Sequence, residues 1–387
     1  MHGRHASAFF VSLLDVSNVF SKDTLEERID ALRPEVGFAE TVDCGQNAKP
    51  DIYVVLEESQ TNPANFPQIT MGDTIGRAMN GDHGGLLPLQ VETFGGGTWI
   101  TAFSLMTGLS STDFGWRSPY LTVSMEDHIK GALPELLGRC GYRTIALLPL
   151  NYTFVNEGPF LKSIGFETVF DMTAIQAPSY HLRDSFYFDA AETVIAQHRK
   201  FDKRPLFLFI ETMFPHSPYE ERMEESIQLP GEPFVNDSSL NEYLRRLIIA
   251  RADFLAFAGR RKQEIKSHPS VVMSFGDHQS IASLPLVREI GGPNVLSEPG
   301  SLAYRTFYTL AGGAPLPPDP QPLDVPFLGT KLLEAAGIPG SPLFKDLARL
   351  RLLCRGSFYA CHERTEIDHH LNQRVAGGYL KLRSRAN

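Results

Sequence analysis

Three consecutive glycines precede a threonine at the start of an apolar run that favours a helix. The segment reads Gly95-Gly96-Gly97-Thr98, and the run continues to Thr107. Glycine permits a tight turn and the close approach of a ligand. The first residues of a helix present unpaired N–H groups that bind anions. Thr98 is therefore a candidate nucleophile toward phosphorus, and an ordinary N-cap in a glycine-rich turn is the alternative.

Carboxylates and an imidazole elsewhere in the chain complete a ligand set for a divalent cation. Glu57, Asp277 and His278 offer two carboxylates and one ring nitrogen, and the Thr98 hydroxyl adds a further oxygen. Such a set suits Mn²⁺, Mg²⁺ or Zn²⁺, which would stabilise a Thr98 alkoxide and screen the charge of a phosphate. The simpler alternatives are a helix-start carboxylate for Glu57 and a turn with a hydrogen-bonded histidine for Asp277-His278.

Alternating apolar runs and helix-like segments predict the framework that positions these residues. Because strands that alternate with helices form parallel βαβ units, the pattern indicates an α/β fold with a doubly wound, mostly parallel sheet. The predicted strands are 52–56, 144–148, 206–210, 271–275 and 306–310, and the predicted helices are 98–107, 129–139, 187–199, 240–258 and 327–336. Ser239 is a plausible cap for the helix that begins at Leu240.

Polar residues directly follow three of the predicted strands. Glu57-Glu58-Ser59 follows the first, Gly276-Asp277-His278 follows the fourth, and a segment from Glu211 to Tyr219 that contains His216 follows the third. Ligands bind beyond the carboxyl ends of the strands in such sheets, so these groups are expected to share one edge. His216 is a further candidate site residue, with a loop histidine that satisfies backbone groups as the alternative.

Composition limits the class of protein. The chain has 387 residues, 42% of them hydrophobic, and a formal net charge of −9. This size and composition suit one large domain or a domain with a small appendage. The absence of a dense Lys/Arg block argues against a nucleic-acid partner. No apolar run reaches the ~18 residues of a membrane span.

The first residues and the cysteines leave several possibilities open. Residues 1–14 make a poor signal peptide, and both the end of a trimmed membrane anchor and an amphipathic first helix fit them. The four cysteines are Cys44, Cys140, Cys354 and Cys361, and none has a CxxC zinc-type spacing. Cys354 and Cys361 would close a small loop in an oxidising compartment.

Four short motifs together resemble the sulfatase-like branch of the alkaline phosphatase superfamily, and they are most similar to the group of lipoteichoic acid synthases, phosphoglycerol transferases and phosphoethanolamine transferases. The motifs are Leu56-Glu57-Glu58-Ser59, Gly97-Thr98, Pro215-His216-Ser217-Pro218-Tyr219 and Phe275-Gly276-Asp277-His278. The similar stretch runs from about Asp51 to about Ala311. The resemblance implies a metal held by Glu57, Thr98, Asp277 and His278, a Thr98 that becomes phosphorylated, and a His216 that contacts the substrate phosphate or leaving group. Glu57 is preferred over Glu58 because it directly follows the strand.

The chain departs from the family pattern in three places. Lipoteichoic-type members carry a histidine and a Trp-Asn-Arg element after the strand at 144–148, whereas this chain has Leu148-Pro149-Leu150-Asn151-Tyr152 and then Phe154-Val155-Asn156-Glu157. An arginine there would clamp phosphate and Glu157 would repel it, so a glycerol-phosphate pocket is not assumed. No cysteines surround the nucleophile as in phosphoethanolamine-type members. The Cys/Ser-x-Pro-x-Arg motif of sulfate-ester hydrolases is also missing, which disfavours sulfatase activity.

The resulting hypothesis is a metal-dependent transferase on an α/β fold, with a mostly parallel sheet between helices. The predicted organisation is a lead-in segment (1–50), a catalytic domain (51–315) and a small C-terminal subdomain (316–387). The resemblance implies a phospholipid headgroup donor, a glycan or lipid acceptor, and an extracytoplasmic location at a membrane surface. The alternatives are a phosphodiesterase or phosphomonoesterase of the same superfamily and a non-catalytic binding domain.

Overall fold

The structure is a computed structural model that describes residues 25–30, 32, 35–80, 85–298, 300–316 and 322–382. The two alternatives for residues 1–14 therefore lie outside the described residues. A central sheet organises the rest, with the strand order β4-β3-β5-β1-β6-β7-β2-β8. The strands are β1 (Asp51–Glu57), β2 (Leu87–Gln90), β3 (Arg143–Leu147), β4 (Thr168–Phe170), β5 (Leu206–Glu211), β6 (Ser270–Gly276), β7 (Arg305–Gly312) and β8 (Leu323–Asp324).

The sheet is mostly parallel, which confirms the predicted fold class. Neighbouring strands from β4 to β6 pair in parallel, and β2 pairs in parallel with β8. β7 is antiparallel to both of its neighbours. All five predicted strands form, but the short strands β2, β4 and β8 were not predicted.

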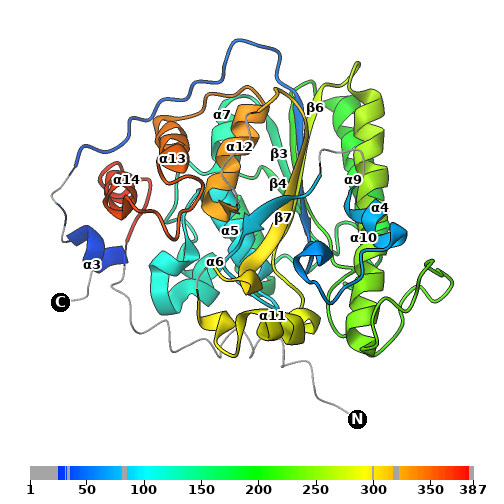
Figure 1. Cartoon of the computed structure of the whole chain (residues 1–387). Coiled ribbons are helices and arrows are strands. Elements are labelled where there is room, and N and C mark those ends of the chain that lie inside the picture. The colour runs from blue at the N-terminus through cyan, green and yellow to red at the C-terminus, as the bar shows by residue number, and fades with distance from the viewer. Residues whose placement is uncertain are drawn as a thin grey trace.

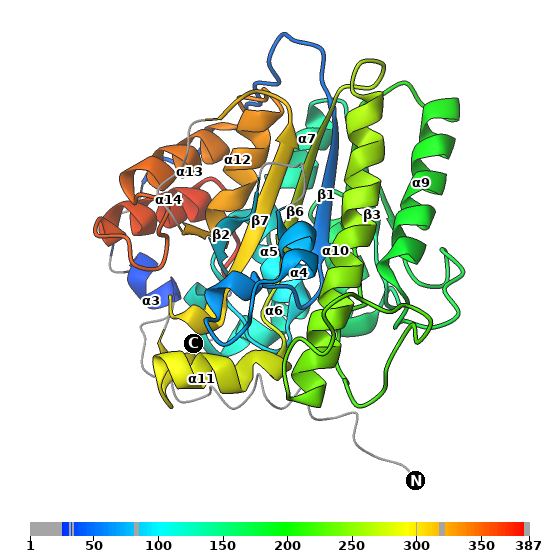
Figure 2. The ribbon, with the colours of Figure 1, turned by 45° about the vertical axis from the view of Figure 1, so that its right-hand side comes forward.

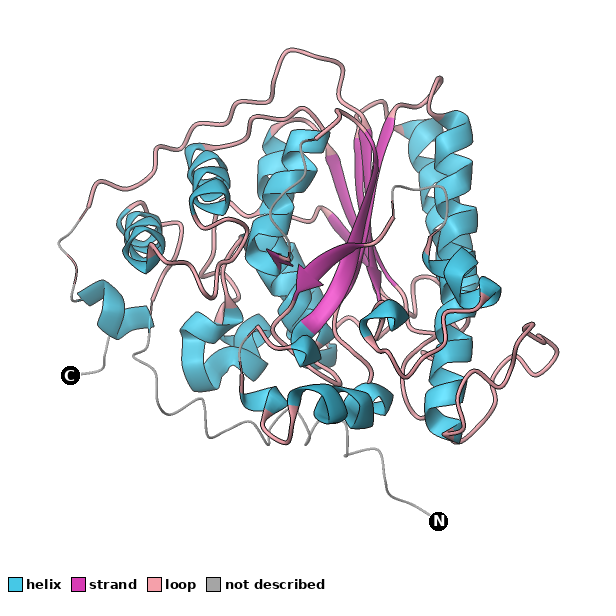
Figure 3. Ribbon diagram, viewed as in Figure 1, coloured by secondary structure: helices cyan, strands magenta, loops and turns pink. Residues whose placement is uncertain are grey.

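Helices cover both faces of the sheet, so the molecule has three layers (Figures 1 and 3). One face is covered by α5 (Thr98–Thr107), α7 (Leu133–Arg139), α8 (Glu157–Ser163), α12 (Leu328–Ala335), α13 (Pro342–Leu353) and α14 (Arg364–Ala376). The other face is covered by α9 (Asp184–Phe201) and α10 (Ser238–Glu264), and α10 lies beside β1 and β6 in the turned view (Figure 2). The shorter helices are α3 (Leu25–Asp30), α4 (Asp73–Met79), α6 (Leu121–Ser124) and α11 (Leu284–Gly291).

Strand alternation divides the core into two parts, one on each face. Ile52, Val54 and Leu56 of β1 pack on the face of α5, α7 and α12. Tyr53 and Val55 pack on the face of α9 and α10. Successive side chains of a strand point to opposite faces, so this alternation also decides where the polar residues at the strand ends point.

The helix predictions are confirmed in place, with corrections at their ends. Helix α5 has the predicted bounds, and α7, α9, α10 and α12 lie within or around the predicted ranges. The N-cap of α10 is Asp237, whose Oδ1 accepts from the N–H of Leu240 at 2.7 Å, and not Ser239. The C-terminal segment, predicted as a helix and a charged tail, also forms α13 and α14.

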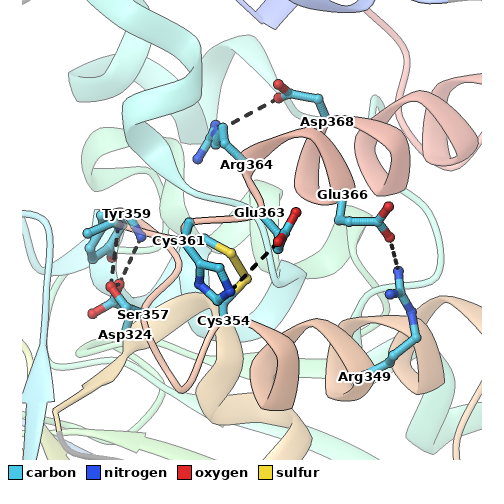
Figure 4. The surroundings of a disulfide bond; sticks show 12 residues. Asp324, Arg349, Cys354, Ser357, Tyr359, Cys361, Glu363, Arg364, Glu366 and Asp368 are labelled. Atoms are coloured by element: carbon cyan, nitrogen blue, oxygen red, sulfur yellow. Dashed lines mark hydrogen bonds and ion pairs between the residues drawn. A yellow bond between two sulfur atoms is a disulfide. The ribbon is translucent and has the colours of Figure 1, made fainter.

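Two disulfide bonds pair all four cysteines. Cys44 pairs with Cys140, and Cys354 pairs with Cys361. The second bond closes the turn between α13 and α14, where Asp324 of β8 accepts from the N–H of Tyr359 at 2.9 Å (Figure 4). The loop predicted for Cys354 and Cys361 therefore forms. Among the described residues, no helix combines the length and apolar character that a membrane span requires.

Replacement of Phe103 tests how strongly the packing around α5 stabilises the fold. Phe103 is fully buried and stacks on Phe160 of α8 at 5.6 Å between ring centroids. We expect Phe103→Ala to lower the free energy of unfolding by about 3–5 kcal/mol because it removes a buried ring and leaves a cavity. Phe201→Ala is the control, since that ring is 77% exposed and its loss should cost less than about 0.5 kcal/mol. Urea denaturation measures both, and equal losses would contradict the expectation.

Candidate active site

Thr98 is the first residue of α5, at the carboxyl edge of the sheet. The preceding Gly97 has φ +91° and ψ 34°, a left-handed conformation that favours glycine. The helix is tied to the segment after β6, because the hydroxyl of Thr101 donates to the Asp277 carbonyl at 2.7 Å. At its other end, Arg374 of α14 donates to the Thr107 carbonyl at 2.9 Å. Both ends of the helix that presents Thr98 are therefore fixed.

Glu58, Asp277 and His278 bring potential ligand atoms within 4.8 Å of one another, and all three side chains are buried. The Thr98 hydroxyl donates to Glu58 Oε2 at 2.9 Å and lies 3.5 Å from His278 Nε2. The structure thus brings three of the predicted site residues together, namely Thr98, Asp277 and His278. The fourth member of the group is Glu58.

Glu57, the carboxylate preferred from the sequence, does not join this group. Its two oxygens accept from Arg251 Nη1 of α10 at 2.6 and 2.8 Å, and both side chains are buried. Glu57 is the last residue of β1 and has the same orientation as Tyr53 and Val55, so it points to the α10 face. Glu58 lies one residue beyond the strand and turns toward Thr98. The structure therefore favours Glu58, one position further along the chain, as the carboxylate of this group.

Hydrogen bonds fix the ligand atoms of the group. One oxygen of Asp277, Oδ1, accepts from the N–H groups of Ser59 at 2.7 Å and His278 at 2.8 Å. His278 Nδ1 lies 3.0 Å from the Gln279 carbonyl. Since a carbonyl only accepts, Nδ1 is the donor in this contact, and Nε2 is the ring nitrogen that faces the site.

The remaining atoms fit a divalent cation. Asp277 Oδ2 is buried without a hydrogen-bond partner and lies 3.2 Å from His278 Nε2. Two electron-pair donors that face each other in a buried place are compensated either by a proton that they share or by a cation between them. Two carboxylates, one imidazole and a hydroxyl are hard and borderline ligands that Mn²⁺, Mg²⁺ and Zn²⁺ accept. The residues present therefore suit the cation that the sequence predicted.

The two carboxyl groups of this cluster have opposite pKa shifts. Burial raises the pKa of Asp277 well above its ordinary value, and the charge of Glu58 adds to that shift. Burial also opposes ionisation of Glu58, but the imidazoles of His278 and His216, with hydrogen bonds from Ser59 and Thr98, lower its pKa overall. Glu58 is thus the carboxylate that the surrounding residues hold in the charged form.

His216 lies in the loop between β5 and α10 and faces the same site, where its ring acts electrostatically on Glu58. The ring is partly exposed, and its Nδ1 contacts the Ser217 carbonyl, which leaves Nε2 free for a substrate. His181 approaches it edge-on with 6.1 Å between ring centroids. Burial and the Arg246 guanidinium lower the pKa of His181 to about 4, so this second ring is neutral at physiological pH.

Buried arginines of α10 hold the loop that carries His216. Arg246 donates to the carbonyls of His216 at 3.0 Å, Pro218 at 2.9 Å and Glu221 at 2.7 Å. Its Nε donates to Glu242 Oε1 at 2.8 Å. The sequence analysis did not identify Arg246 or His181. Neither stands in a recognisable motif, and only the tertiary contact of α10 with the loop reveals them.

The family of the chain follows from comparison with known proteins. A family model described as sulfatase matches residues 83–279, just over half of the chain. The chain therefore belongs to the sulfatase family, and the resemblance stated from its motifs is confirmed.

The fold of this chain is similar to that of several solved structures. Phosphoglycerol transferase GacH from Streptococcus pyogenes superposes with a TM-score of 0.65 at 17% identity and covers 96% of this chain and 92% of that chain. Lipoteichoic acid synthase LtaP from Listeria monocytogenes gives 0.59 at 17% identity, with 82% and 78% covered. The soluble domain of lipooligosaccharide phosphoethanolamine transferase A from Neisseria meningitidis gives 0.51 at 16% identity, with 80% and 95% covered.

Curated relatives are longer than this chain. An uncharacterized protein of Haemophilus influenzae is 29% identical over 253 residues, which are 60% of this chain and 44% of the relative. A putative cyclic beta-1,2-glucan modification protein of Rhizobium meliloti is 25% identical over 243 residues, which are 59% of this chain and 36% of the relative. The matched region thus spans less than half of either relative.

A stability measurement tests whether Glu57 and Arg251 form a structural ion pair that is independent of the site. We expect Glu57→Leu and Arg251→Met each to lower the free energy of unfolding by about 3–5 kcal/mol, because each leaves a buried charge unpaired. The double variant should lose much less than the sum, since it leaves no charge behind. Urea denaturation of the three variants measures this, and additive losses would show that the pair is not coupled.

Proposed function

We propose that the protein transfers a phosphorus-containing headgroup from a phospholipid to a glycan or lipid acceptor through a covalent intermediate on Thr98. The observation that carries this proposal is the position of the Thr98 hydroxyl. It stands at the start of a ten-residue helix, donates to Glu58 and lies beside His278. The N-terminal N–H groups of the helix are suited to a phosphate oxygen. The transferase folds described above agree with this reaction class.

The chain's own residues would divide the work as follows. Thr98 Oγ1 forms the new bond to phosphorus and gives up its proton, for which Glu58 Oε2 is the nearest acceptor. The bond from phosphorus to the donor alcohol breaks, and His216 is placed to give the departing oxygen a proton. In the second half, the acceptor hydroxyl attacks the same phosphorus and gives its proton to His216. The bond from phosphorus to Thr98 Oγ1 breaks, and the proton on Glu58 returns to that oxygen. A cation held by Glu58, Asp277 and His278 would supply Lewis-acid stabilisation of negative oxygen.

The proposed location is outside the cytoplasm, at a membrane surface where a phospholipid donor is available. All four cysteines form disulfides, and such bonds persist in oxidising compartments. The Neisseria meningitidis relative is described as the soluble domain of a lipooligosaccharide-modifying transferase, which agrees with an envelope location.

Neighbouring carboxylates provide a matched test of the metal site. We expect Glu58→Gln to weaken Mn²⁺ or Zn²⁺ binding at least about 100-fold, since the change removes a direct ligand. Glu57→Gln should leave the affinity within a few-fold, because Glu57 pairs with Arg251 on the other face. Titration calorimetry on folded samples, with a thermal melt of each variant, measures both. Loss of affinity in Glu57→Gln alone would reverse the assignment.

Intact mass spectrometry tests the covalent step. Incubation with mixed phospholipid vesicles should add one headgroup phosphate to the wild-type chain, and peptide mapping should place it on Thr98. Thr98→Ala should carry no adduct and show no turnover, whereas Thr98→Ser should retain the adduct because it keeps a hydroxyl. Turnover by Thr98→Ala would refute the nucleophile. Release of free headgroup phosphate without an acceptor product would assign the protein as a hydrolase instead.

A further inference from the structure

A second pair of buried carboxyl groups lies at the same edge of the sheet and has no role in the chemistry above. Glu157 is the first residue of α8, and Glu211 is the last residue of β5. Their exposed fractions are 6% and 2%, and their carboxyl groups are hydrogen-bonded to each other. Lone glutamates are seldom buried this deeply, so the pair needs a physical explanation.

Strand alternation places this pair on the face of the sheet that carries Thr98. Phe207 and Phe209 of β5 pack on the α5 face, and Glu211 has the same orientation. Helix α8 lies beside α5, since Phe160 stacks on Phe103. Close to Thr98, the ring of Trp99 meets Phe154, which stands three residues before Glu157, at 6.4 Å between centroids. The carboxyl pair and the nucleophile therefore occupy one neighbourhood.

Each carboxyl group of the pair has one oxygen that makes no hydrogen bond. Glu157 Oε1 and Glu211 Oε1 are buried without a hydrogen-bond partner. The other charges that act on both side chains are the carboxylates of Glu58 and Asp277. Burial raises the pKa of Glu157 to about 7, and burial together with Glu157 raises that of Glu211 well above its ordinary value. The pair therefore holds at least one proton near neutral pH, and its ionisation is opposed by burial and by the neighbouring carboxylates.

A donor phosphate would add more negative charge to this neighbourhood. These carboxyl groups would repel a phosphate ester whose alcohol part is an uncharged polyol as strongly as any other anion. A headgroup with its own positive charge removes that conflict. A primary ammonium has three N–H donors for the free oxygens, and such charge-assisted hydrogen bonds are the strong ones. In an ethanolamine ester, only two carbon atoms separate the ammonium from the phosphate oxygen.

We propose that Glu157 and Glu211 bind the primary ammonium of the donor, and that the transferred group is phosphoethanolamine and not phosphoglycerol. This inference rests on the proposed function, because it assigns the donor of the Thr98 reaction. The ammonium remains protonated throughout, so the transfer step keeps the balance given above. The alternative is that the two glutamates only stabilise the fold. The ratio of labelling by the two donors distinguishes an ammonium site from a structural role, because this ratio does not depend on the amount of folded protein.

The experiment compares two donors on four proteins. Wild type, Glu157→Gln, Glu211→Gln and the control Glu126→Gln are each incubated with vesicles of phosphatidylethanolamine or phosphatidylglycerol, and the adduct on Thr98 is measured by intact mass. Glu126 is a matched control, since its carboxylate accepts from Asn156, the residue before Glu157, at 2.7 Å. We expect wild type and Glu126→Gln to favour the ethanolamine donor about tenfold or more, and both site variants to lose that preference.

The outcomes separate this inference from the proposed function. Equal labelling by both donors, a preference for phosphatidylglycerol, or an unchanged preference in both site variants would overturn the ammonium site and leave the Thr98 chemistry standing. If neither donor labels wild type, the proposed function fails, and the ammonium site is then tested by ligand affinity alone. In that case, glycerophosphoethanolamine should bind wild type about tenfold more tightly than the Glu157→Gln variant, with glycerol phosphate unaffected, and equal affinities would overturn the site.

Discussion

The site depends on one constraint: several carboxyl groups are buried at the same edge of the sheet, and each needs compensation. An ionised carboxylate taken out of water is costly unless it is paired or hydrogen-bonded. Glu57 has Arg251, Asp277 has two backbone N–H groups, and Glu58 has hydroxyl donors and nearby imidazoles. These partners come from α10, from α5, from the turns after β1 and β6, and from the loop after β5. The edge therefore holds its ligand geometry only while the elements around it stay packed.

Helix α10 supports two different parts of this arrangement. Near its middle, Arg251 neutralises Glu57 beneath the site. One and a half turns earlier, Arg246 holds the loop of His216 through main-chain carbonyls. Because every residue has a main-chain carbonyl, these hydrogen bonds do not require particular side chains in the loop. From the opposite face of the sheet, this helix thus holds both the Glu57 carboxylate and the loop that carries His216.

The sequence predicted the elements with strong periodic signals and missed those that tertiary contacts decide. The strands 52–56 and 206–210 and the helix 98–107 are apolar runs, and they form nearly as predicted. β2, β4 and β8 have two to four residues, which is too short for a periodic pattern. Alternation gives Glu57 the orientation of Tyr53 and Val55, but only the packing of α5 on the opposite face shows that this orientation leads away from Thr98. Arg246 and His181 were not predicted, because their roles arise only where α10 meets a distant loop.

The arrangement also explains how a site rich in carboxylates can receive an anion. The N–H groups at the start of α5 attract phosphate at one point only, and the surrounding field is negative. A cation on Glu58, Asp277 and His278 would reverse the sign of the field next to Thr98, but Glu157 and Glu211 lie outside that group. A ligand that is negative at one end and positive at the other matches this pattern of charge in a single orientation. Orientation in turn fixes which bond to phosphorus lies opposite the attacking Thr98 oxygen. Charge pattern, and not pocket shape alone, would then decide both which donor is accepted and which bond is broken.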